Sequence, residues 1–126
     1  MRKAKLKVGE IVQVPVYEYA PFRSGWNGWL FQVGIITRVF KGAKTGRMCA
    51  EVEYPSRSYA QRLRNMRGED AGLGERKVLK KAFYADAVFQ FDIAHCKREK
   101  EEHPREKYFN GCYDADTEFL IDKGII

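Results

Sequence analysis

Three runs of alternating apolar and polar residues between residues 8 and 54 constrain the fold of this chain more than any other feature. The first run, residues 8–16, places Val12, Val14 and Val16 at alternate positions, which is the period of a half-buried strand. The second, residues 30–41, is apolar on both faces and is therefore expected to be central in a sheet. A turn with two glycines leads to the third run, residues 47–54. This order predicts a small, strongly bent antiparallel sheet, a shape found mostly in binding modules.

Individual residues refine the three predicted strands. Pro15 has no N–H to donate, so the first strand is expected to lie at an edge or to bend there. Gly34 stands in the middle of the second strand and indicates a sharp bend or a bulge, which a small barrel needs in order to close. In the third strand, the alternation places Met48 on the buried face and Cys49 on the solvent-facing one.

The remainder of the chain mixes helical and extended patterns. Residues 58–67 predict a short helix that Ser58 caps and Gly68 ends. Residues 82–92 return to the alternation of a strand. Residues 97–102 carry mixed charges and predict a solvated helical turn, and residues 116–124 predict a short helix with an acidic start and a glycine stop.

Composition limits the class of protein. Of the 126 residues, 44% are apolar, which is enough for a core, and 32% are charged. No apolar run approaches the roughly 18 residues that a bilayer span needs. The three cysteines are an odd number without regular spacing, which argues against a disulfide framework. We therefore expect a soluble intracellular protein of the cytoplasm, nucleoid or nucleus, with no membrane partner.

Charge is distributed unevenly along the chain. Residues 1–56 hold nine Lys and Arg against four Asp and Glu, and residues 57–81 hold eight against three. Residues 82–126 hold six against ten. A basic front and middle can attract phosphate backbones or acidic peptides, although the same charges also make an ordinary solubilising surface.

The strand pattern resembles the SH3-like small barrel superfamily in its Tudor, PWWP and KOW variants. Residues 8–14 (Val-Gly-Glu-Ile-Val-Gln-Val), 34–39 (Gly-Ile-Ile-Thr-Arg-Val) and 51–54 (Glu-Val-Glu-Tyr) carry the resemblance. Members of those families often open with a similar glycine–acid–x–valine strand and continue with a glycine–x–isoleucine strand after an aromatic loop. The resemblance implies a closed barrel of antiparallel strands.

The expected organisation is a single domain over residues 1–126. Its fold class is mostly β, an SH3-like antiparallel small barrel with a basic helical insert and a short C-terminal helix. The barrel core covers about residues 8–54 and 82–92, the basic insert residues 55–81, and the C-terminal tail residues 93–126.

An aromatic segment is the first candidate site. It is predicted to be a loop between the first two strands, and its candidate residues are Tyr17, Tyr19, Trp26 and Trp29. Faces of Trp and Tyr can hold a cation or stack on a base. Resemblance to Tudor modules implies that such a loop supplies part of an aromatic cage. The alternative is that these rings only cap the open end of the barrel.

The basic insert is the second candidate site. Its proposed phosphate-binding residues are Arg57, Arg62, Arg64, Arg67, Lys80 and Lys81. The planar guanidinium group of Arg suits phosphate oxygens and base edges. The alternative is a solvated helix that packs on the barrel through Tyr59, Leu63 and Met66, and the two interpretations are compatible.

Metal binding and catalysis are not expected. His95, Cys96, His103 and Cys112 are possible zinc ligands, but their spacing matches no strong zinc pattern. The sequence has no nucleophile elbow, no phosphate-cradling glycine loop and no zinc-protease motif. We expect no catalytic residue, no metal and no cofactor.

Together these features predict a non-enzymatic module that binds nucleic acid, DNA or RNA, through the basic insert and the exposed aromatic loop. In this hypothesis Trp26 and Tyr19 stack or pack against a base or sugar. The alternative is a protein-interaction module, either a reader of a peptide or methylated lysine or an effector that binds a partner protein.

Overall fold

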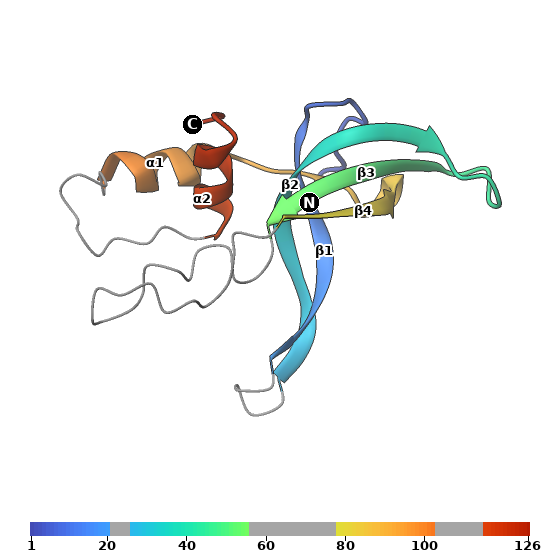
Figure 1. The fold of residues 1–126 in the computed structure, drawn as a ribbon, viewed down its shortest axis with the longest axis horizontal. Helices are drawn as coiled ribbons and strands as arrows, with labels where there is room; N and C mark the ends of the chain where they lie inside the picture. Colours follow the sequence, from blue (N-terminus) through green and yellow to red (C-terminus); the bar gives the residue numbers. More distant parts are fainter. Residues whose placement is uncertain (21–25, 56–77, 103–114) are drawn as a thin grey trace. The chain divides into compact units, whose positions relative to one another are not determined.

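A computed structural model describes residues 1–20, 26–55, 78–102 and 115–126 of the chain (Figure 1). The elements in chain order are β1 (Ile11–Ala20), β2 (Trp26–Lys41), β3 (Met48–Pro55), β4 (Val78–Tyr84), the 3₁₀ turn η2 (Ala85–Ala87), β5 (Phe89–Gln90), α1 (Ala94–Glu102) and α2 (Ala115–Asp122). The chain forms two compact units. The strand unit comprises Met1–Glu53 and Lys80–Phe91, and the helical unit comprises Tyr54–Leu79 and Asp92–Ile126.

The five strands form one antiparallel sheet in the order β4-β3-β2-β1-β5. Strands β1 and β2 pair from Ile11 opposite Ile35 to Ala20 opposite Trp26, and Figure 1 shows them as a long, curved hairpin. Strand β1 also pairs with β5, so the last strand returns beside the first. The prediction of a mostly β chain with an antiparallel sheet and a short C-terminal helix is therefore confirmed. Over the described residues the sheet is not closed into a barrel, because β4 and β5 stand at its two ends.

Alternating valines and isoleucines build the core of the strand unit, as their period predicts. Val12 and Val14 of β1 are fully buried, and so are Val33 of β2 and Val52 of β3. Burying each such side chain contributes roughly 1.5–3 kcal/mol. The core therefore lies along the central strands and fixes the register of the hairpin, because a slip of one residue would expose these valines.

The aromatic segment is strand at both ends, and the prediction of a loop over residues 17–29 is wrong. Strand β1 continues to Ala20 and β2 already begins at Trp26, so only residues 21–25 separate them. The backbone register places Tyr17 opposite Trp29 and Tyr19 opposite Asn27. Aromatic residues favour extended pairing, and here that preference outweighs the turn signal of the local Gly and Asn residues.

The irregularity of β2 lies three residues beyond the predicted position. Gly34 pairs regularly with Val12, whereas the register with β3 shifts between Ile36 and Arg38. Thr37 occupies this shift, and its hydroxyl lies 2.9 Å from the Glu51 Oε1 atom and can donate to it. The bulge is therefore stabilised by a side-chain hydrogen bond rather than by the flexibility of Gly34.

Residues 82–92 do not form one strand, so that prediction is wrong as well. Strand β4 ends at Tyr84, η2 follows, and β5 contains only Phe89 and Gln90. The N–H of Val88 donates to the carbonyl oxygen of Ala85 at 3.3 Å and closes the turn. Strand β4 starts at Val78, so Lys80 and Lys81 belong to the sheet rather than to a helical insert.

The N-terminal residues form a short extra pairing along β5. The N–H of Gln90 donates to the carbonyl oxygen of Arg2 at 2.8 Å, and the N–H of Ala4 donates to the carbonyl oxygen of Val88 at 3.0 Å. Lys3 and Phe89 form an antiparallel bridge between these bonds. Strand β5 is therefore held on one side by β1 and on the other by residues 2–4.

The helical unit contains α1 and α2, which are joined by a partly buried hydrogen bond. The hydroxyl of Thr117, fully buried, donates to the Glu99 Oε2 atom at 2.7 Å. Cys96, Phe119 and Leu120 are fully buried. Helix α1 begins three residues before the predicted helical turn, and α2 confirms the predicted C-terminal helix. No helix in the described ranges is long and apolar enough to cross a membrane.

Gly124 ends the last helix in a conformation that favours glycine. Its φ angle is 74°, and the N–H of Ile125 donates to the carbonyl oxygen of Leu120 at 2.9 Å. We expect Gly124→Ala to lower the free energy of unfolding by about 1 kcal/mol, because a Cβ atom strains this backbone. Thermal unfolding would measure the change, with Lys97→Ala as an exposed helical control. An unchanged melting temperature would contradict this account of the helix end.

Candidate functional site

The turn between β2 and β3 is tightly built and carries the first side chains of the candidate site. The N–H of Gly42 donates to the carbonyl oxygen of Arg47 at 2.8 Å, and the N–H of Gly46 donates to the carbonyl oxygen of Gly42 at 2.9 Å. Gly46 has a φ angle of 68°. A Cβ atom on Gly42 would lie 2.9 Å from the Thr45 Oγ1 atom, so a side chain at this position would require the Thr45 side chain to shift. Gly46 has the positive φ angle that favours glycine in a tight turn, whereas Gly42 is not in that conformation and lies close to the Thr45 side chain.

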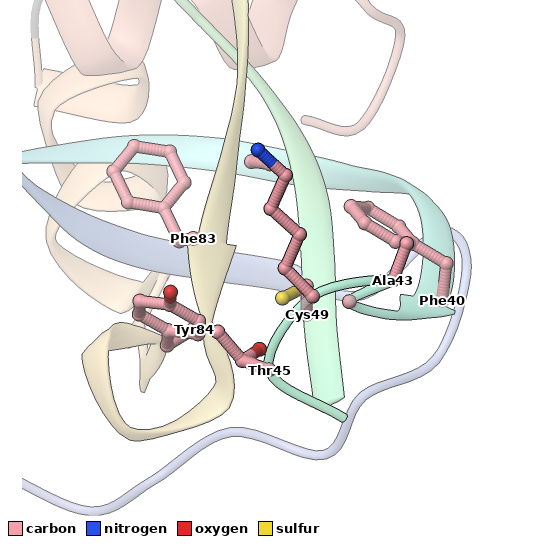
Figure 2. A pocket seen from close by; sticks show the side chains of 9 residues that line it. Phe40, Ala43, Thr45, Cys49, Phe83 and Tyr84 are labelled. Atoms are coloured by element: carbon pink, nitrogen blue, oxygen red, sulfur yellow. The ribbon is translucent and has the colours of Figure 1, made fainter. Parts of the chain in front are cut away.

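An open pocket of about 390 Å³ lies between this turn and strands β3 and β4 (Figure 2). The lining includes Phe40, Ala43, Thr45, Cys49, Phe83 and Tyr84. In Figure 2, Phe83 and Tyr84 of β4 lie on one side, and Phe40 and Ala43 lie on the other. The volume is within the range of roughly 300–1,000 Å³ that small-molecule sites occupy.

Arg47 fixes one wall of the pocket. Its guanidinium carbon lies 3.8 Å from the centre of the Tyr84 ring, and its Nη2 atom lies 3.1 Å from the Asp86 Oδ2 atom. Tyr84 keeps 41% of its surface exposed. Because the ion pair is exposed, it contributes less than about 1 kcal/mol to stability. Its main effect is to orient the Tyr84 ring beside the pocket.

The carboxylates of this part of the strand unit are already paired with cations. The Glu51 Oε2 atom lies 3.8 Å from the Arg38 Nη2 atom, and the Glu53 Oε2 atom lies 4.0 Å from the Lys80 Nζ atom. Asp86 is held by Arg47, as described above. These contacts neutralise the acidic groups of β3 and η2, so they do not oppose an anionic ligand.

Three lysines near the pocket keep their charges available. We call Lys41, Lys44 and Lys81 the pocket-flanking lysines, because each lines the pocket or directly precedes or follows a residue that does. All three are exposed, and none forms an ion pair with another residue of the described ranges. Over its described residues the strand unit holds ten Lys and Arg against five Asp and Glu. The pocket therefore opens on a surface with excess positive charge.

The residues predicted for the basic site separate into two groups. Lys80 and Lys81 are exposed on β4, where Lys80 pairs with Glu53 and Lys81 flanks the pocket. The other predicted phosphate-binding residues lie outside the described part of the chain: Arg57, Arg62, Arg64 and Arg67. The structure thus places Lys81 next to the pocket. The phosphate-binding role of the arginines stays a prediction.

The residues predicted for the aromatic site are brought together by the backbone. Tyr17 and Tyr19 lie in β1, and Trp26 and Trp29 lie in β2. Tyr17 and Trp29 occupy directly opposed positions of the hairpin. This arrangement is a strand ribbon rather than the exposed loop that the sequence predicts.

The possible zinc ligands do not assemble in the described residues. Within these ranges no group of three His, Cys, Asp or Glu side chains could hold a metal ion. Cys96 is fully buried in α1, whereas His95 is exposed, with its Nε2 atom 4.0 Å from the Glu99 Oε2 atom. His103 and Cys112 lie outside the described residues.

The pocket was not predicted from the sequence. The burial of Cys49 and Met48 is the reverse of what the alternation in the third strand predicts. Cys49, expected on the solvent face, is only 6% exposed, whereas Met48, expected in the core, is 44% exposed. The β2–β3 turn covers Cys49, since its Sγ atom lies 3.7 Å from the position of a Gly42 Cβ atom. Simple alternation does not anticipate such a turn. The aromatic residues Phe40, Phe83 and Tyr84 were the available signal.

Comparison with protein-family models, with curated proteins and with solved structures finds no match to this chain. The functional argument therefore depends on the fold and the site alone.

Proposed function

We propose that this chain is an SH3-like small barrel module that binds nucleic acid and catalyses no reaction. The strand order supports the barrel, because β1 pairs with both β2 and β5. A chain whose last strand returns beside its first has the connection that a small closed barrel needs. The bulge at Thr37 adds the local bend that closure requires.

The observation that carries the functional proposal is the combination of free lysines and exposed aromatic surface. Lys44 lines a pocket whose walls include Tyr84 and Phe40, and Lys41 and Lys81 adjoin lining residues in sequence. The nearby carboxylates are paired with other cations. Phosphates attract such lysines, and the bases of nucleic acids stack on aromatic rings. A polymer that presents both groups at regular spacing fits this surface better than a purely acidic peptide.

The arginine-rich segment extends the proposed surface. Residues 56–77 join β3 to β4 and lead directly into the strand that carries Lys80 and Lys81. We propose that its arginines add phosphate contacts to those of the lysines: Arg57, Arg62, Arg64 and Arg67. Tyr19 and Trp26 of the β1–β2 hairpin are proposed to pack against a base or sugar.

Binding of labelled single-stranded DNA, duplex DNA and RNA by fluorescence anisotropy tests this function. We expect a dissociation constant in the micromolar range or tighter at low salt. For four neutralised phosphates of a single strand, affinity should fall roughly 50-fold between about 50 and 200 mM salt, because bound counterions are released on association. Absence of binding to all three polymers at low salt would overturn the proposal.

A protein-interaction module is the second candidate, and the position of β4 favours it. Strand β4 ends the sheet order and is exposed along most of its length, including Val78 and Leu79. An extended peptide could add to such an edge through backbone hydrogen bonds. A pull-down with two variants separates the candidates. If the Trp26→Ala variant no longer binds a protein partner and the Arg57/Arg62/Arg64/Arg67→Gln variant still does, the result favours the protein-interaction module.

A further inference from the structure

We propose that the pocket between the β2–β3 turn and β4 holds one unstacked base of a single-stranded nucleic acid, with the adjoining phosphate on Lys44. This inference rests on the proposed function and specifies the part of the polymer that the pocket recognises. It predicts that the protein prefers single strands to duplexes. Three properties of the pocket carry the argument: its walls, its charge and its size.

The walls of the pocket suit a flat aromatic ligand. Phe83 and Tyr84 approach from β4, and Phe40 approaches from the end of β2 (Figure 2). The Tyr84 ring is oriented by Arg47, whose guanidinium carbon lies 3.8 Å from the ring centre. A ring that is fixed before binding loses little freedom when a base stacks on it.

The space itself comes from small side chains. Ala43 and Ala82 line the pocket together with Cys49, which is nearly buried. Thr45 contributes a hydroxyl group that can hydrogen-bond a base edge, and Lys44 contributes an ammonium group. The pocket therefore combines apolar walls with a few polar groups, which is the usual composition of a site for one small ring system.

Charge selects among the ligands that could fill such a space. Lys44 lines the pocket, and Arg47 covers part of the Tyr84 ring. These cations disfavour a methylated lysine, which also carries positive charge, because like charges repel across an interface. They favour an aromatic group with an anion attached to it. A nucleotide unit has this combination.

The size of the pocket favours one unpaired base over a stacked base pair. A volume of about 390 Å³ accepts one ring system with its sugar, and the bases of a duplex reach such a pocket only after leaving the stack. Unpaired bases of a single strand are available without that energetic cost. The geometry therefore points to single-stranded DNA or RNA.

A pocket-filling variant, Ala82→Leu, is the first test. Affinities for a single strand and for a duplex of the same length would be measured for the wild type, for Ala82→Leu and for Leu79→Ala, an exposed β4 control outside the pocket. We expect the wild type to prefer the single strand. Ala82→Leu should weaken single-strand binding by roughly 5- to 150-fold, the range for losing one stacked base, with the duplex affinity and salt slope unchanged. Leu79→Ala should leave both affinities unchanged.

A titration of the wild type needs no variant and identifies the chemical group in the pocket. Two-dimensional ¹H–¹⁵N spectra would be recorded with a nucleoside monophosphate and with ribose 5-phosphate. We expect the nucleotide to shift the amides of Gly42, Thr45 and Ala82, and ribose 5-phosphate to shift mainly those next to Lys44 and to leave Ala82 in place. Equal shifts with both compounds would mean that only phosphate binds, and the inference would be overturned.

The two proposals fail in distinguishable ways. If no polymer binds at low salt, the proposed function and this inference both fall. If polymers bind with a steep salt dependence, but Ala82→Leu binds a single strand as the wild type does or loses single strand and duplex equally, only the base pocket is overturned. Circular dichroism would establish that Ala82→Leu is folded.

Discussion

Replacing the three pocket-flanking lysines with glutamine should weaken single-stranded DNA binding on the order of 100-fold at about 50 mM salt, because the release of roughly two counterions is lost. The slope of the logarithm of the affinity against the logarithm of the salt concentration should become shallower by about two. Lys41, Lys44 and Lys81 have no carboxylate partner in the described ranges, so their removal leaves no buried charge behind. Anisotropy titrations at several salt concentrations would measure both quantities.

A charge-matched control separates a local surface from net charge. Lys3, Lys5 and Lys7 are exposed, and none of them lines the pocket or adjoins a lining residue in sequence, so a triple glutamine variant removes the same charge from other positions of the strand unit. If the affinity depends on the pocket-flanking lysines, this control should lose less than about threefold in affinity, because salt screens charges beyond roughly 10 Å. Equal losses in both variants would show that total charge alone attracts the polymer. A variant with glutamine in place of the four predicted arginines would be measured in parallel: Arg57, Arg62, Arg64 and Arg67. Its loss of affinity would give the contribution of the segment between β3 and β4 to binding.

Phe119→Ala should destabilise the protein by roughly 3–5 kcal/mol, because a fully buried aromatic side chain is lost and a cavity remains. Phe119 lies in α2 between buried Glu118 and buried Leu120, two residues after the Thr117 hydroxyl that bonds Glu99. Typical domains have only about 5–15 kcal/mol of stability, so the helical unit would lose much of its margin.

Urea unfolding followed by circular dichroism would measure the effect of Phe119→Ala. Lys97→Ala, an exposed substitution on α1, is the control and should change the unfolding free energy by no more than about 0.5 kcal/mol. A loss below about 1 kcal/mol for Phe119→Ala would contradict the packing of α2 described here, since full burial of Phe normally costs more to remove.

Local patterns predicted the elements whose geometry is local. The period of Val12 and Val14, the two-glycine turn and the helix that Gly124 ends all follow from neighbouring residues. The break between β4 and β5 was missed because Phe83 and Phe89 continue an even spacing through η2. The alternation of apolar residues does not show where a 3₁₀ turn changes the direction of the chain.

The candidate site was harder to predict because it joins distant segments. Lys81 was singled out for its charge, and its neighbours in sequence gave no indication that β4 would meet the β2–β3 turn. The pocket depends on the β3–β4 pairing, which brings residues 82–84 next to residues 40–49. Such pairings across long sequence separations are fixed by tertiary packing, so the sequence showed the residue types of the site and not their assembly.

The pairing of residues 2–4 with β5 also determines when the sheet can be completed during synthesis. The N–H of Gln90 donates to the carbonyl oxygen of Arg2 and the N–H of Ala4 donates to the carbonyl oxygen of Val88, so residues 2–4 cannot complete this pairing until residues near position 90 have been made. Contacts across such separations form slowly, because the intervening chain must be closed into a loop first. Residues 2–4 are therefore without their β5 partner in a nascent chain until Phe89 and Gln90 have been made.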